Sequence, residues 1–556
     1  MDSPRLSGYS RVRENDNRYL NRSHKEPFMN QRPNILLILN DDMGYSDIGC
    51  YGGEIDTPNL DALAERGLRF TQFYNTARCC PTRASILTGL HPHQADVGHM
   101  MRDDGVDGYL GDLNQDTATI AEVLKGAGYA TYMSGKWHVT RHTPPDGSTH
   151  NWPLQRGFDR FYGIIHGASD FFYPPHLVDG NTPCSPPDDP DYYLTDDISD
   201  RCCDMLREHA QDGGDAPFFT YLAYTAPHWP LHAPEEDVAK YRGRFDRGWD
   251  RLREERLERL KASGILSDQW TLSERDEGVP PWEDEPEKEW QARRMEVYAA
   301  QVEIMDRGIG RVVDTLRDTG QLDNTLIIFL ADNGGCAEEL HGDLGNRCGR
   351  ATVGTTTKDG LPVRHGNAPA ILPGSPDTFC SYGLPWANVS NAPFRRYKHW
   401  VHEGGIATPF IVHWPAGIAA ENGIRHQPYQ LPDIMATFCD VAGATYPETR
   451  GGHRVQPCEG YSMASSFDDA EAPSARDVLT WEHEGNCALR RGKWKLVNRY
   501  PGSWELYDME TDRSETHDVA DEHPDIVRVL ADLYQAWADR CHVMPWDELK
   551  AVRSRK

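Results

Sequence analysis

Acidic side chains stand at two places where buried strands are predicted to end. Asp41 and Asp42 follow one apolar run of strand length. Asp332 and Asn333 follow another. Ligand sites of open α/β sheets lie just beyond the carboxyl ends of the strands. Three carboxylates and one amide oxygen are hard donors, which suit Ca²⁺ or Mg²⁺ better than zinc. A single such doublet is more often a turn or a helix cap, but two at strand ends are less easily explained in that way.

A cysteine that could act as a nucleophile stands at the predicted start of a helix. Cys79 opens the run Cys-Cys-Pro-Thr-Arg. Pro81 is favoured in the first helical turn, and residues 84–87 are acceptable helix formers. Backbone N–H groups and the helix dipole would favour an anion at Cys79. The alternative is a reduced cysteine pair at the start of an ordinary helix.

An anion-binding site in this chain needs its own positive charge, because the formal net charge is −28. An acidic protein repels anionic substrates at long range, although salt screens this beyond about 10 Å. Lys136 and His138 follow a predicted strand, and His228 follows another within Pro-His-Trp-Pro. Lys398 lies in a further loop, shortly before two glycines. Taken singly, such residues are usually solvated lysines, satisfied histidines or rigid turns; together they would supply local cations.

In combination, these stretches resemble the sulfatase family. Cys79-x-Pro-x-Arg83, with Thr88-Gly89 behind it, resembles the family signature. The stretches 383–388 and 400–403 look most like bacterial arylsulfatases. The other motifs follow in the family's order within residues 33–520, and they are Gly135-Lys136-Trp137-His138, Pro227-His228-Trp229-Pro230, and Lys398 five residues before Glu403-Gly404-Gly405.

The resemblance implies a modified nucleophile. A separate formylglycine-generating or sulfatase-maturating enzyme would convert Cys79 to formylglycine (3-oxoalanine), whose hydrate attacks sulfate esters. Arg83 would hold the nucleophile's oxygen. His228 would contact the sulfate ester or protonate the leaving oxygen, and His138 would assist the release of sulfate. The residues that the resemblance assigns to binding the substrate's sulfate group are Lys136, His228 and Lys398.

The resemblance also implies a divalent metal. Its ligands would be Asp41, Asp42, Asp332 and Asn333, with Ca²⁺ expected and Mg²⁺ as the alternative. The ion would polarise a sulfate oxygen and help to ionise the aldehyde hydrate.

The implied activity is that of an arylsulfatase-like sulfuric ester hydrolase of the alkaline phosphatase superfamily. It would cleave aryl or carbohydrate sulfate esters to an alcohol or phenol and inorganic sulfate. A phosphonate or phosphate monoester hydrolase on the same scaffold stays open as an alternative. So does a non-catalytic protein that binds sulfated glycans and keeps Cys79 unmodified. The expected partners are a sulfated small molecule or sulfated glycan and the maturation enzyme.

Composition narrows the class of protein further. The chain has 556 residues, 38% of them hydrophobic, which is enough for a large core and two domains. No basic block exceeds a few residues, so nucleic acid is not an expected partner. The sequence contains no run of 18 consecutive apolar residues, so no membrane span is predicted. The 13 cysteines have no dense disulfide spacing, and residues 1–32 contain no apolar signal region. We therefore expect a cytoplasmic protein in which one or two disulfides are possible. A periplasmic or secreted protein is the alternative if the true start of the chain differs.

Apolar runs of strand length alternate with amphipathic helices, which predicts an α/β fold. We expect a large domain with a mixed, mostly parallel central sheet flanked by helices, and a smaller C-terminal α+β domain with a short antiparallel sheet. The predicted strands are 34–39, 130–133, 218–224, 326–330 and 410–413, and the predicted helices are 59–66, 117–125 and 289–318.

The predicted domain organisation has three parts. Residues 1–32 form a disordered polar tail, 33–470 the catalytic domain and 471–556 the small C-terminal domain. Within the catalytic domain, 232–286 is a charged insertion whose helix at 251–261 is solvated, and 336–397 is a loop-rich substrate region. The sequence does not name the physiological substrate or the oligomeric state.

Overall fold

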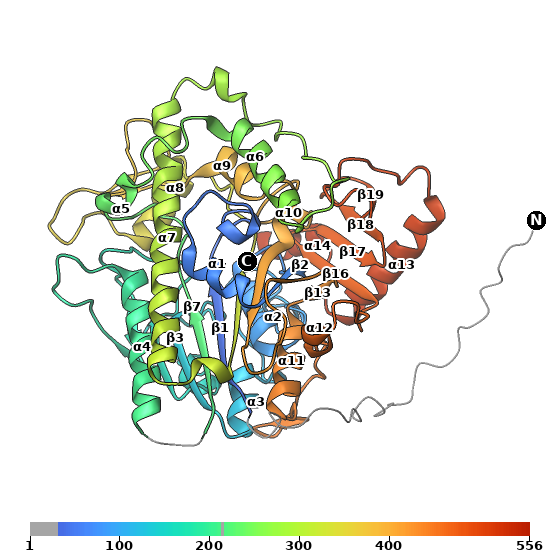
Figure 1. Cartoon of the computed structure of the whole chain (residues 1–556), viewed down its shortest axis with the longest axis horizontal. Coiled ribbons are helices and arrows are strands. Elements are labelled where there is room, and N and C mark those ends of the chain that lie inside the picture. Colours follow the sequence, from blue (N-terminus) through green and yellow to red (C-terminus); the bar gives the residue numbers. More distant parts are fainter. Residues whose placement is uncertain (1–31, 213–215, 556) are drawn as a thin grey trace, which may run out of the picture.

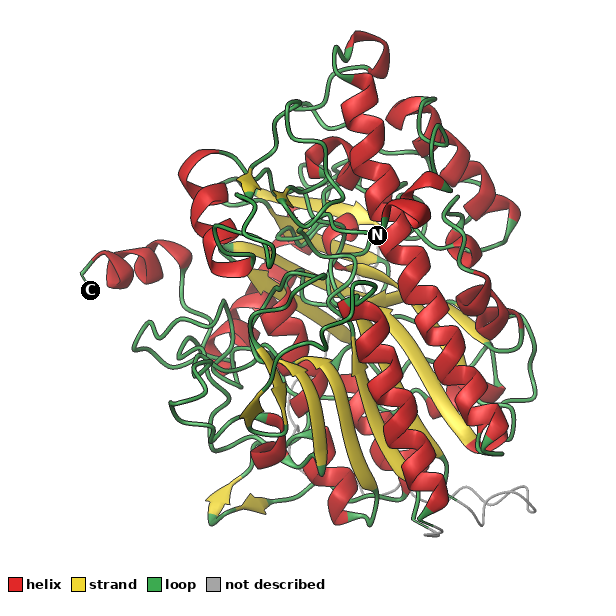
Figure 2. Ribbon diagram, turned by 90° about the vertical axis from the view of Figure 1, so that its left-hand side faces the viewer, coloured by secondary structure: helices red, strands yellow, loops and turns green. Residues whose placement is uncertain are grey.

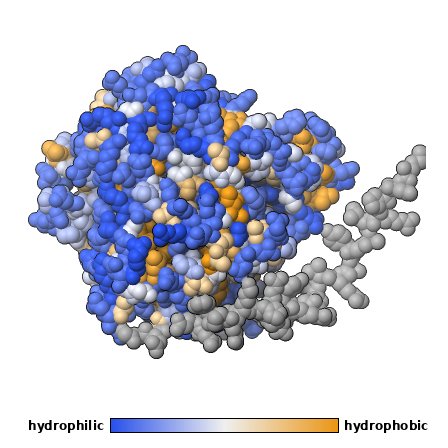
Figure 3. Space-filling view, viewed as in Figure 1, coloured by the Kyte–Doolittle hydropathy of each residue, from blue (hydrophilic) through white to orange (hydrophobic). Residues whose placement is uncertain are grey.

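The computed structural model describes residues 32–212 and 216–555 of the chain. The predicted disordered tail therefore lies, except for Arg32, outside the described residues. The described part contains an eleven-stranded sheet in the order β12-β2-β11-β8-β1-β7-β3-β4-β5-β6, with β13 paired to β2. Figure 1 shows this sheet running through the body of the molecule, with a separate lobe of C-terminal elements at the right. Figure 3 shows that the face of the molecule seen in Figure 1 is mostly hydrophilic with scattered hydrophobic patches, in keeping with the many charged residues.

Four parallel strands form the centre of the sheet, and each follows from an apolar run in the sequence. They pair in the order β8-β1-β7-β3. Next to them β11 runs antiparallel to both β8 and β2, so the sheet is mixed but mostly parallel, as predicted. The strands are β1 (Asn34–Asn40), β2 (Leu68–Tyr74), β3 (Ala130–Lys136), β4 (Arg160–Ile164), β5 (Leu177–Asp179), β6 (Thr182–Pro183), β7 (Phe218–Ala223), β8 (Thr325–Ala331), β11 (Ala407–His413), β12 (Gly423–Arg425) and β13 (Tyr429–Gln430).

Helices cover both faces of the sheet, because the central strands are apolar on both sides. In β1, Leu36 and Ile38 belong to one core cluster, whereas Leu37 and Leu39 belong to the other. The first cluster lies under α1 (Pro58–Glu65), α4 (Leu194–Gln211) and α7 (Lys288–Asp318). The second lies under α2 (Cys79–Thr88), α3 (Ile120–Gly126) and α11 (Pro432–Ala442). Figure 2 shows the strands between helices.

The predicted charged helix exists as α6 (Gly248–Ala262), but the expectation that it is solvated was wrong for one of its faces. Arg256 is fully buried and pairs with Asp47 at 2.8 Å and with Glu54 at 2.7 Å. Trp249 and Leu252 are buried on the same helix. A buried arginine needs ionic partners. Those of Arg256 are far away in the sequence, and composition alone does not reveal them.

The segment 336–397 is not entirely loop, since it contains α8 (Gly342–Thr352), α9 (Gly383–Ser390) and the strand pair β9 (Arg364–His365) and β10 (Thr378–Phe379). The remaining short elements are α5 (Glu235–Ala239), α10 (Glu403–Ile406), α12 (Ala464–Asp468), α14 (Trp546–Ser554), the pair β14 (Thr449–Arg450) and β15 (His453–Arg454), and 3₁₀ helices at Gly49–Tyr51, Pro153–Arg156, Trp282–Asp284 and Leu322–Asn324.

The C-terminal elements form the predicted antiparallel sheet. It runs in the order β16-β17-β18-β19 and packs against one helix, α13, through its own apolar cluster. The exact boundary at residue 470 stays a prediction. The elements are β16 (Val478–His483), β17 (Asn486–Arg491), β18 (Trp494–Asn498), β19 (Trp504–Asp508) and α13 (Pro524–Arg540).

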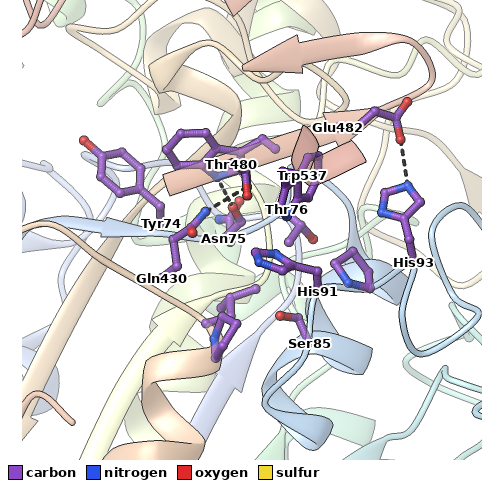
Figure 4. A pocket seen from close by; sticks show the side chains of 14 residues that line it. Tyr74, Asn75, Thr76, Ser85, His91, His93, Gln430, Thr480, Glu482 and Trp537 are labelled. Atoms are coloured by element: carbon purple, nitrogen blue, oxygen red, sulfur yellow. Dashed lines mark hydrogen bonds and ion pairs between the residues drawn. The ribbon is translucent and has the colours of Figure 1, made fainter. Parts of the chain in front are cut away.

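This sheet is joined to the predicted catalytic domain by polar contacts around a small cavity of about 10 Å³. Figure 4 shows the cavity, where the Gln430 amide donates to the Thr480 carbonyl at 3.0 Å and His93 pairs with Glu482 at 2.8 Å. The volume is about that of a single water probe, so the two parts fit closely here.

A buried ionic network joins the same two parts through Glu403, which stands five residues after the predicted substrate-binding Lys398. Glu403, from the Glu-Gly-Gly motif, accepts from Lys495 at 2.9 Å and from Arg513 at 2.8 Å. Lys495 also pairs with Glu515 at 2.7 Å. All four side chains of this network are fully buried. The C-terminal segment thus supplies the counter-charges for a glutamate of the catalytic domain.

We predict that Glu403→Gln lowers the free energy of unfolding near neutral pH by about 3 kcal/mol, because two buried cations lose their partner. Burial acts to raise the pKa of Glu403, but Lys495 and Arg513 lower it to about 2. A pKa that is lower in the folded than in the unfolded chain stabilises the fold above the unfolded value of about 4.3, and this contribution is lost as the pH falls towards 2. The difference between wild type and variant in urea denaturation should therefore shrink between about pH 5 and pH 3. A difference in the free energy of unfolding that stays constant over this range would contradict the lowered pKa of Glu403. The control is Glu283→Gln, at an exposed position.

Candidate active site

The predicted metal ligands lie together because β1 and β8 are parallel and in register. Asn40 is paired with Ala331, so the residues that follow leave the sheet side by side. The Asn333 amide donates to Asp42 at 2.7 Å, and the backbone N–H of Asp42 points to Asp332 at 3.3 Å. The structure thus brings together all four predicted ligands, each fully buried: Asp41, Asp42, Asp332 and Asn333.

Each of the three carboxylates in this group has its own buried cation. Lys136, the last residue of β3, pairs with Asp41. Lys398 lies 2.7 Å from Asp42. The third pair joins Arg83 of α2 to Asp332 at 2.8 Å. The predicted substrate-binding cations are therefore present, but they are paired with the predicted metal ligands and are not solvated.

The charges in this cluster shift the carboxylate pKa values in opposite directions. Burial acts to raise the pKa of Asp41, but Lys136, His228 and Arg83 lower it to about 2. Burial and the neighbouring charge of Asp41 hold the pKa of Asp332 well above its usual range. The two carboxylates repel each other when both are ionised, and a bound divalent ion would relieve this repulsion.

The donor set fits a divalent cation. Asp41 Oδ1 and Asn333 Oδ1 are buried oxygen atoms without a hydrogen-bond partner in the structure. Buried acceptors are nearly always satisfied, so two orphaned oxygens beside crowded carboxylates are typical of ligands for a hard ion. The residues that would hold such an ion are the four side chains predicted from the sequence, Asp41, Asp42, Asp332 and Asn333.

The predicted nucleophile lies at the start of α2, as expected. Cys79 is buried, and its sulfur lies within 4.8 Å of ligand atoms of Cys80 and His138. Its thiol stands where the oxygen atoms of a formylglycine would be. Hydrogen bonds with Cys80 and His138 and the charge of Lys136 outweigh burial and place the pKa of the Cys79 thiol well below its usual value. An anion at this position is therefore stabilised, as the helix N-terminus predicts.

The two predicted catalytic histidines contact different residues of the site. His228 Nδ1 lies 2.7 Å from the Trp229 carbonyl oxygen, which can only accept, so Nδ1 carries the proton. Its Nε2 faces Asp42 at 3.3 Å. His138 Nε2 lies 3.2 Å from the Cys80 sulfur. Burial and the charge of Lys136 lower the pKa of His138 to about 4, so its ring is neutral near pH 7.

Arg83 has partners that the sequence analysis did not predict. Its Nε and Nη2 both donate to Asp332, and its Nη1 donates to the Lys136 carbonyl at 3.0 Å. These bonds hold a predicted metal ligand and the end of β3. A contact of Arg83 with the nucleophile's oxygen stays a prediction.

The glycines near Lys398 allow close approach of backbone segments, as the motif suggested. A Cβ added at Gly334 would lie 2.0 Å from the Gly404 carbonyl oxygen, and one added at Gly404 would lie 2.2 Å from the Arg396 carbonyl oxygen. Only glycine fits at such distances. The loop after β8 and the segment that carries Lys398 are thereby packed together.

Glu338 is a site residue that the sequence analysis missed. It accepts from Arg78 and from the Trp229 indole, both at 2.9 Å. Burial acts to raise its pKa, but Lys398 and Arg78 lower the pKa well below the usual range. Its only sequence signal is its place in the loop after Asp332, which is too weak to distinguish it from other surface acids.

The comparisons with known proteins agree with this geometry. The chain matches the Sulfatase family model over residues 33–444, and a model described as N-sulphoglucosamine sulphohydrolase, C-terminal, over residues 395–540. An arylsulfatase of Klebsiella aerogenes is 35% identical over 461 residues, covering 81% of this chain and 95% of that protein. An uncharacterised sulfatase of Schizosaccharomyces pombe is 33% identical over 539 residues, covering 91% and 93%. The crystal structure of Ps i-CgsB in complex with k-i-k-neocarrahexaose aligns with a TM-score of 0.64 at 25% identity, covering 91% of this chain and 93% of that chain.

Fold, site and relatives together define a hydrolase of sulfuric esters. The chain belongs to the sulfatase family. Family membership implies a formylglycine and a divalent metal, and the structure provides a cysteine and a set of oxygen donors that fit them. Among the described residues, no helix combines the length and the apolar character needed to cross a membrane.

We predict that Lys136→Ala destabilises the protein by about 3 kcal/mol or more, because Asp41 would stay buried without its counter-charge. The loss should be smaller when a divalent ion is present, since the ion supplies positive charge to the same carboxylate. Urea denaturation with chelator and with added Ca²⁺ measures both values. The control is Lys125→Ala, which removes a half-exposed pair with Asp159 and should cost less than about 1 kcal/mol. Equal effects of the two substitutions would contradict the role of Lys136 in the cluster.

Proposed function

We propose that this sulfatase cleaves aryl or carbohydrate sulfate esters through a formylglycine formed from Cys79, with Ca²⁺ as its metal. The observation that carries the proposal is the position of Cys79 at the N-terminus of α2, beside Lys136 and His138 and next to a buried group of oxygen donors. The similarity to an arylsulfatase supports aryl substrates. The similarity to a structure in complex with a neocarrahexaose supports carbohydrate substrates.

The two groups that the chain must acquire have defined positions in this proposal. Asp41, Asp42, Asp332 and Asn333 would hold the ion, which supplies positive charge to the oxygens of a bound sulfate. A formylglycine at position 79 supplies, as its hydrate, an oxygen nucleophile that can later eliminate sulfate, which a thiol cannot do.

The side chains of the chain itself account for the charge and proton movements. Lys136 and Lys398 flank the oxygen donors and can donate to the sulfate group once the ion shares their carboxylates. His228 is held by the Trp229 carbonyl in the tautomer whose Nε2 faces the site, from where a protonated ring can give a proton to the leaving oxygen. His138, with its lowered pKa, is a base near position 79 that can accept a proton when sulfate is released. Fixed positive charge around the sulfate oxygens would lower the barrier further.

The alternative of a phosphonate or phosphate monoester hydrolase has the weaker support. A phosphonate monoester hydrolase of Agrobacterium radiobacter shares the fold, with a TM-score of 0.55 at 19% identity. Paired kcat/KM values on the sulfate and the phosphate ester of one phenol separate the two functions. A higher value for the phosphate ester would favour the alternative.

The burial of Cys79 also bears on the partner that modifies it. A side chain that is 2% exposed is not accessible to another enzyme in the folded protein. We therefore propose that the formylglycine-generating or sulfatase-maturating enzyme acts on the stretch 79–83 before α2 packs.

The state of the cysteines bears on the compartment. All 13 cysteines lie among the described residues and none forms a disulfide. This supports the proposal that the protein works in the cytoplasm.

Mass spectrometry of the peptide that contains position 79 tests the nucleophile. Conversion of cysteine to formylglycine should lower the peptide mass by about 18 Da. Cys79→Ala should abolish turnover, because only Cys79 is the proposed precursor of the formylglycine. Cys80→Ala should retain turnover. Both variants keep the helix and the cations, so they differ only in the nucleophile. Equal loss of activity in both variants, with unchanged circular dichroism, would show that the nucleophile is assigned to the wrong residue.

Removal of the metal tests the oxygen donors. Exhaustive chelation should abolish activity, and Ca²⁺ should restore it at a lower concentration than Mg²⁺. Asn333→Ala should raise the Ca²⁺ concentration needed for half-maximal activity at least about tenfold, because one ligand is lost. Asn324→Ala, at the other end of β8, should leave it unchanged. Full activity in protein that contains no metal by elemental analysis would overturn the proposal.

A further inference from the structure

A second group of metal-binding side chains lies where the C-terminal sheet meets the catalytic domain. His99 comes from the loop that follows α2. His483 is the last residue of β16, and Glu484 begins the turn into β17. One ligand atom from each of these three residues lies within 4.8 Å of the others. None of the three has a part in the proposed hydrolysis.

The three side chains lie close enough together to share one ion. Glu484 Oε1 lies 2.6 Å from His99 Nε2 and 3.9 Å from His483 Nε2. The two imidazole rings have their centroids 5.5 Å apart. Two imidazoles on one tetrahedral zinc, with Zn–N distances of about 2.0–2.1 Å, have centroids roughly 5 Å apart, so little movement is needed.

The buried histidine of this group lacks partners in the structure. His483 is fully buried, and neither Nδ1 nor Nε2 has a hydrogen-bond partner. A buried polar group without a partner costs free energy, which a bound ligand would remove. A ring that is free at both nitrogens and faces a carboxylate and a second imidazole is well suited to a metal.

A further histidine orients the carboxylate. His399 Nε2 lies 3.4 Å from the Asn486 side-chain nitrogen, which can only donate, so Nε2 accepts. Its Nδ1 therefore carries a proton, and it faces Glu484 Oε2 at 3.1 Å. This contact leaves Oε1 directed to His99 and His483. Ligating carboxylates are commonly fixed by such an outer hydrogen bond.

We propose that His99, His483 and Glu484 bind Zn²⁺, with His399 as the residue that positions Glu484. Two imidazole nitrogens and one carboxylate oxygen favour zinc over Ca²⁺, which prefers oxygen ligands only. Three protein ligands leave a fourth position for water. The side chains of His99 and Glu484 are partly exposed, at 13% and 26%, so solvent reaches the site.

The ion would connect the C-terminal sheet to the rim of the active site. Its ligands come from the loop after α2 and from the β16–β17 turn, which are about 385 residues apart in sequence. His399 directly follows Lys398, which pairs with Asp42 in the active site. Zinc would therefore stabilise the placement of the C-terminal sheet against the segment that carries Lys398.

Zinc binding to the full-length, untagged protein tests this site. Ca²⁺ is kept in excess to fill the oxygen donors, and Cys79→Ala with Cys80→Ala forms the parent protein, so that the thiols near His138 cannot bind zinc. Competition with a chromophoric chelator gives the Kd for Zn²⁺. Substitution of Co²⁺ for Zn²⁺ reports tetrahedral coordination by its visible absorption.

His99→Ala and Glu484→Gln should each weaken zinc binding by more than about 100-fold and remove the Co²⁺ absorption, and His399→Ala should weaken it by about 10–100-fold. The matched control is His150→Ala, which alters the more exposed group of Asp112, His142 and His150 and should leave this Kd unchanged. Zinc should also raise the Tm of the parent but not of His99→Ala. Unchanged zinc binding in folded His99→Ala and Glu484→Gln, or a parent that binds no zinc, would overturn the proposal.

Discussion

The structure depends on the neutralisation of buried carboxylates at the carboxyl edge of the central sheet. Asp41, Asp42 and Asp332 are removed from water by the packing of helices on both faces, and a buried charge without a partner is too costly to retain. Each is therefore matched by one cation from a different element: Lys136 from β3, Lys398 from the loop before β11, and Arg83 from α2. These pairs bring together the end of β3, the loop that carries Lys398, and α2, the helix that carries Cys79. The catalytic arrangement is thus a consequence of charge balance within the fold.

The same pairing connects stability with function. In the free protein, each of these lysines is paired with an aspartate. When a divalent ion shares that aspartate, the lysine becomes available to a sulfate. Binding of the metal is therefore expected to favour binding of the substrate, and the reverse. The C-terminal sheet extends this arrangement. Lys495 and Arg513 neutralise Glu403, which lies five residues after Lys398, and so they fix the loop that carries this lysine. The C-terminal elements therefore support the segment that follows Lys398 without supplying one of the proposed catalytic residues.

Most of the site could be predicted from the sequence, because its signals are local. Apolar runs marked the parallel strands, and the residues directly after them were expected at one edge, where the structure places them. The predictions were weaker wherever a partner is distant in sequence. The charged helix α6 was expected to be solvated, yet Arg256 is buried against Asp47 and Glu54, about 200 residues away. The only sequence signal of Glu338, its place in the loop after Asp332, was too weak to identify it. The contact of Glu403 with Lys495 joins segments whose proximity only the folded chain reveals.

The central claim is that the four oxygen donors at the sheet edge are arranged for one divalent ion. A crystal structure of the Ca²⁺-loaded protein with an anomalous difference map measures this most directly. The account predicts a single peak with Asp41 Oδ1, Asn333 Oδ1 and oxygens of Asp42 and Asp332 at about 2.3–2.6 Å. It also predicts that Lys136 and Lys398 turn away from full pairing with their aspartates. A map without a peak at this position, or an ion held elsewhere while Asp41 Oδ1 and Asn333 Oδ1 remain without a partner, would contradict the account.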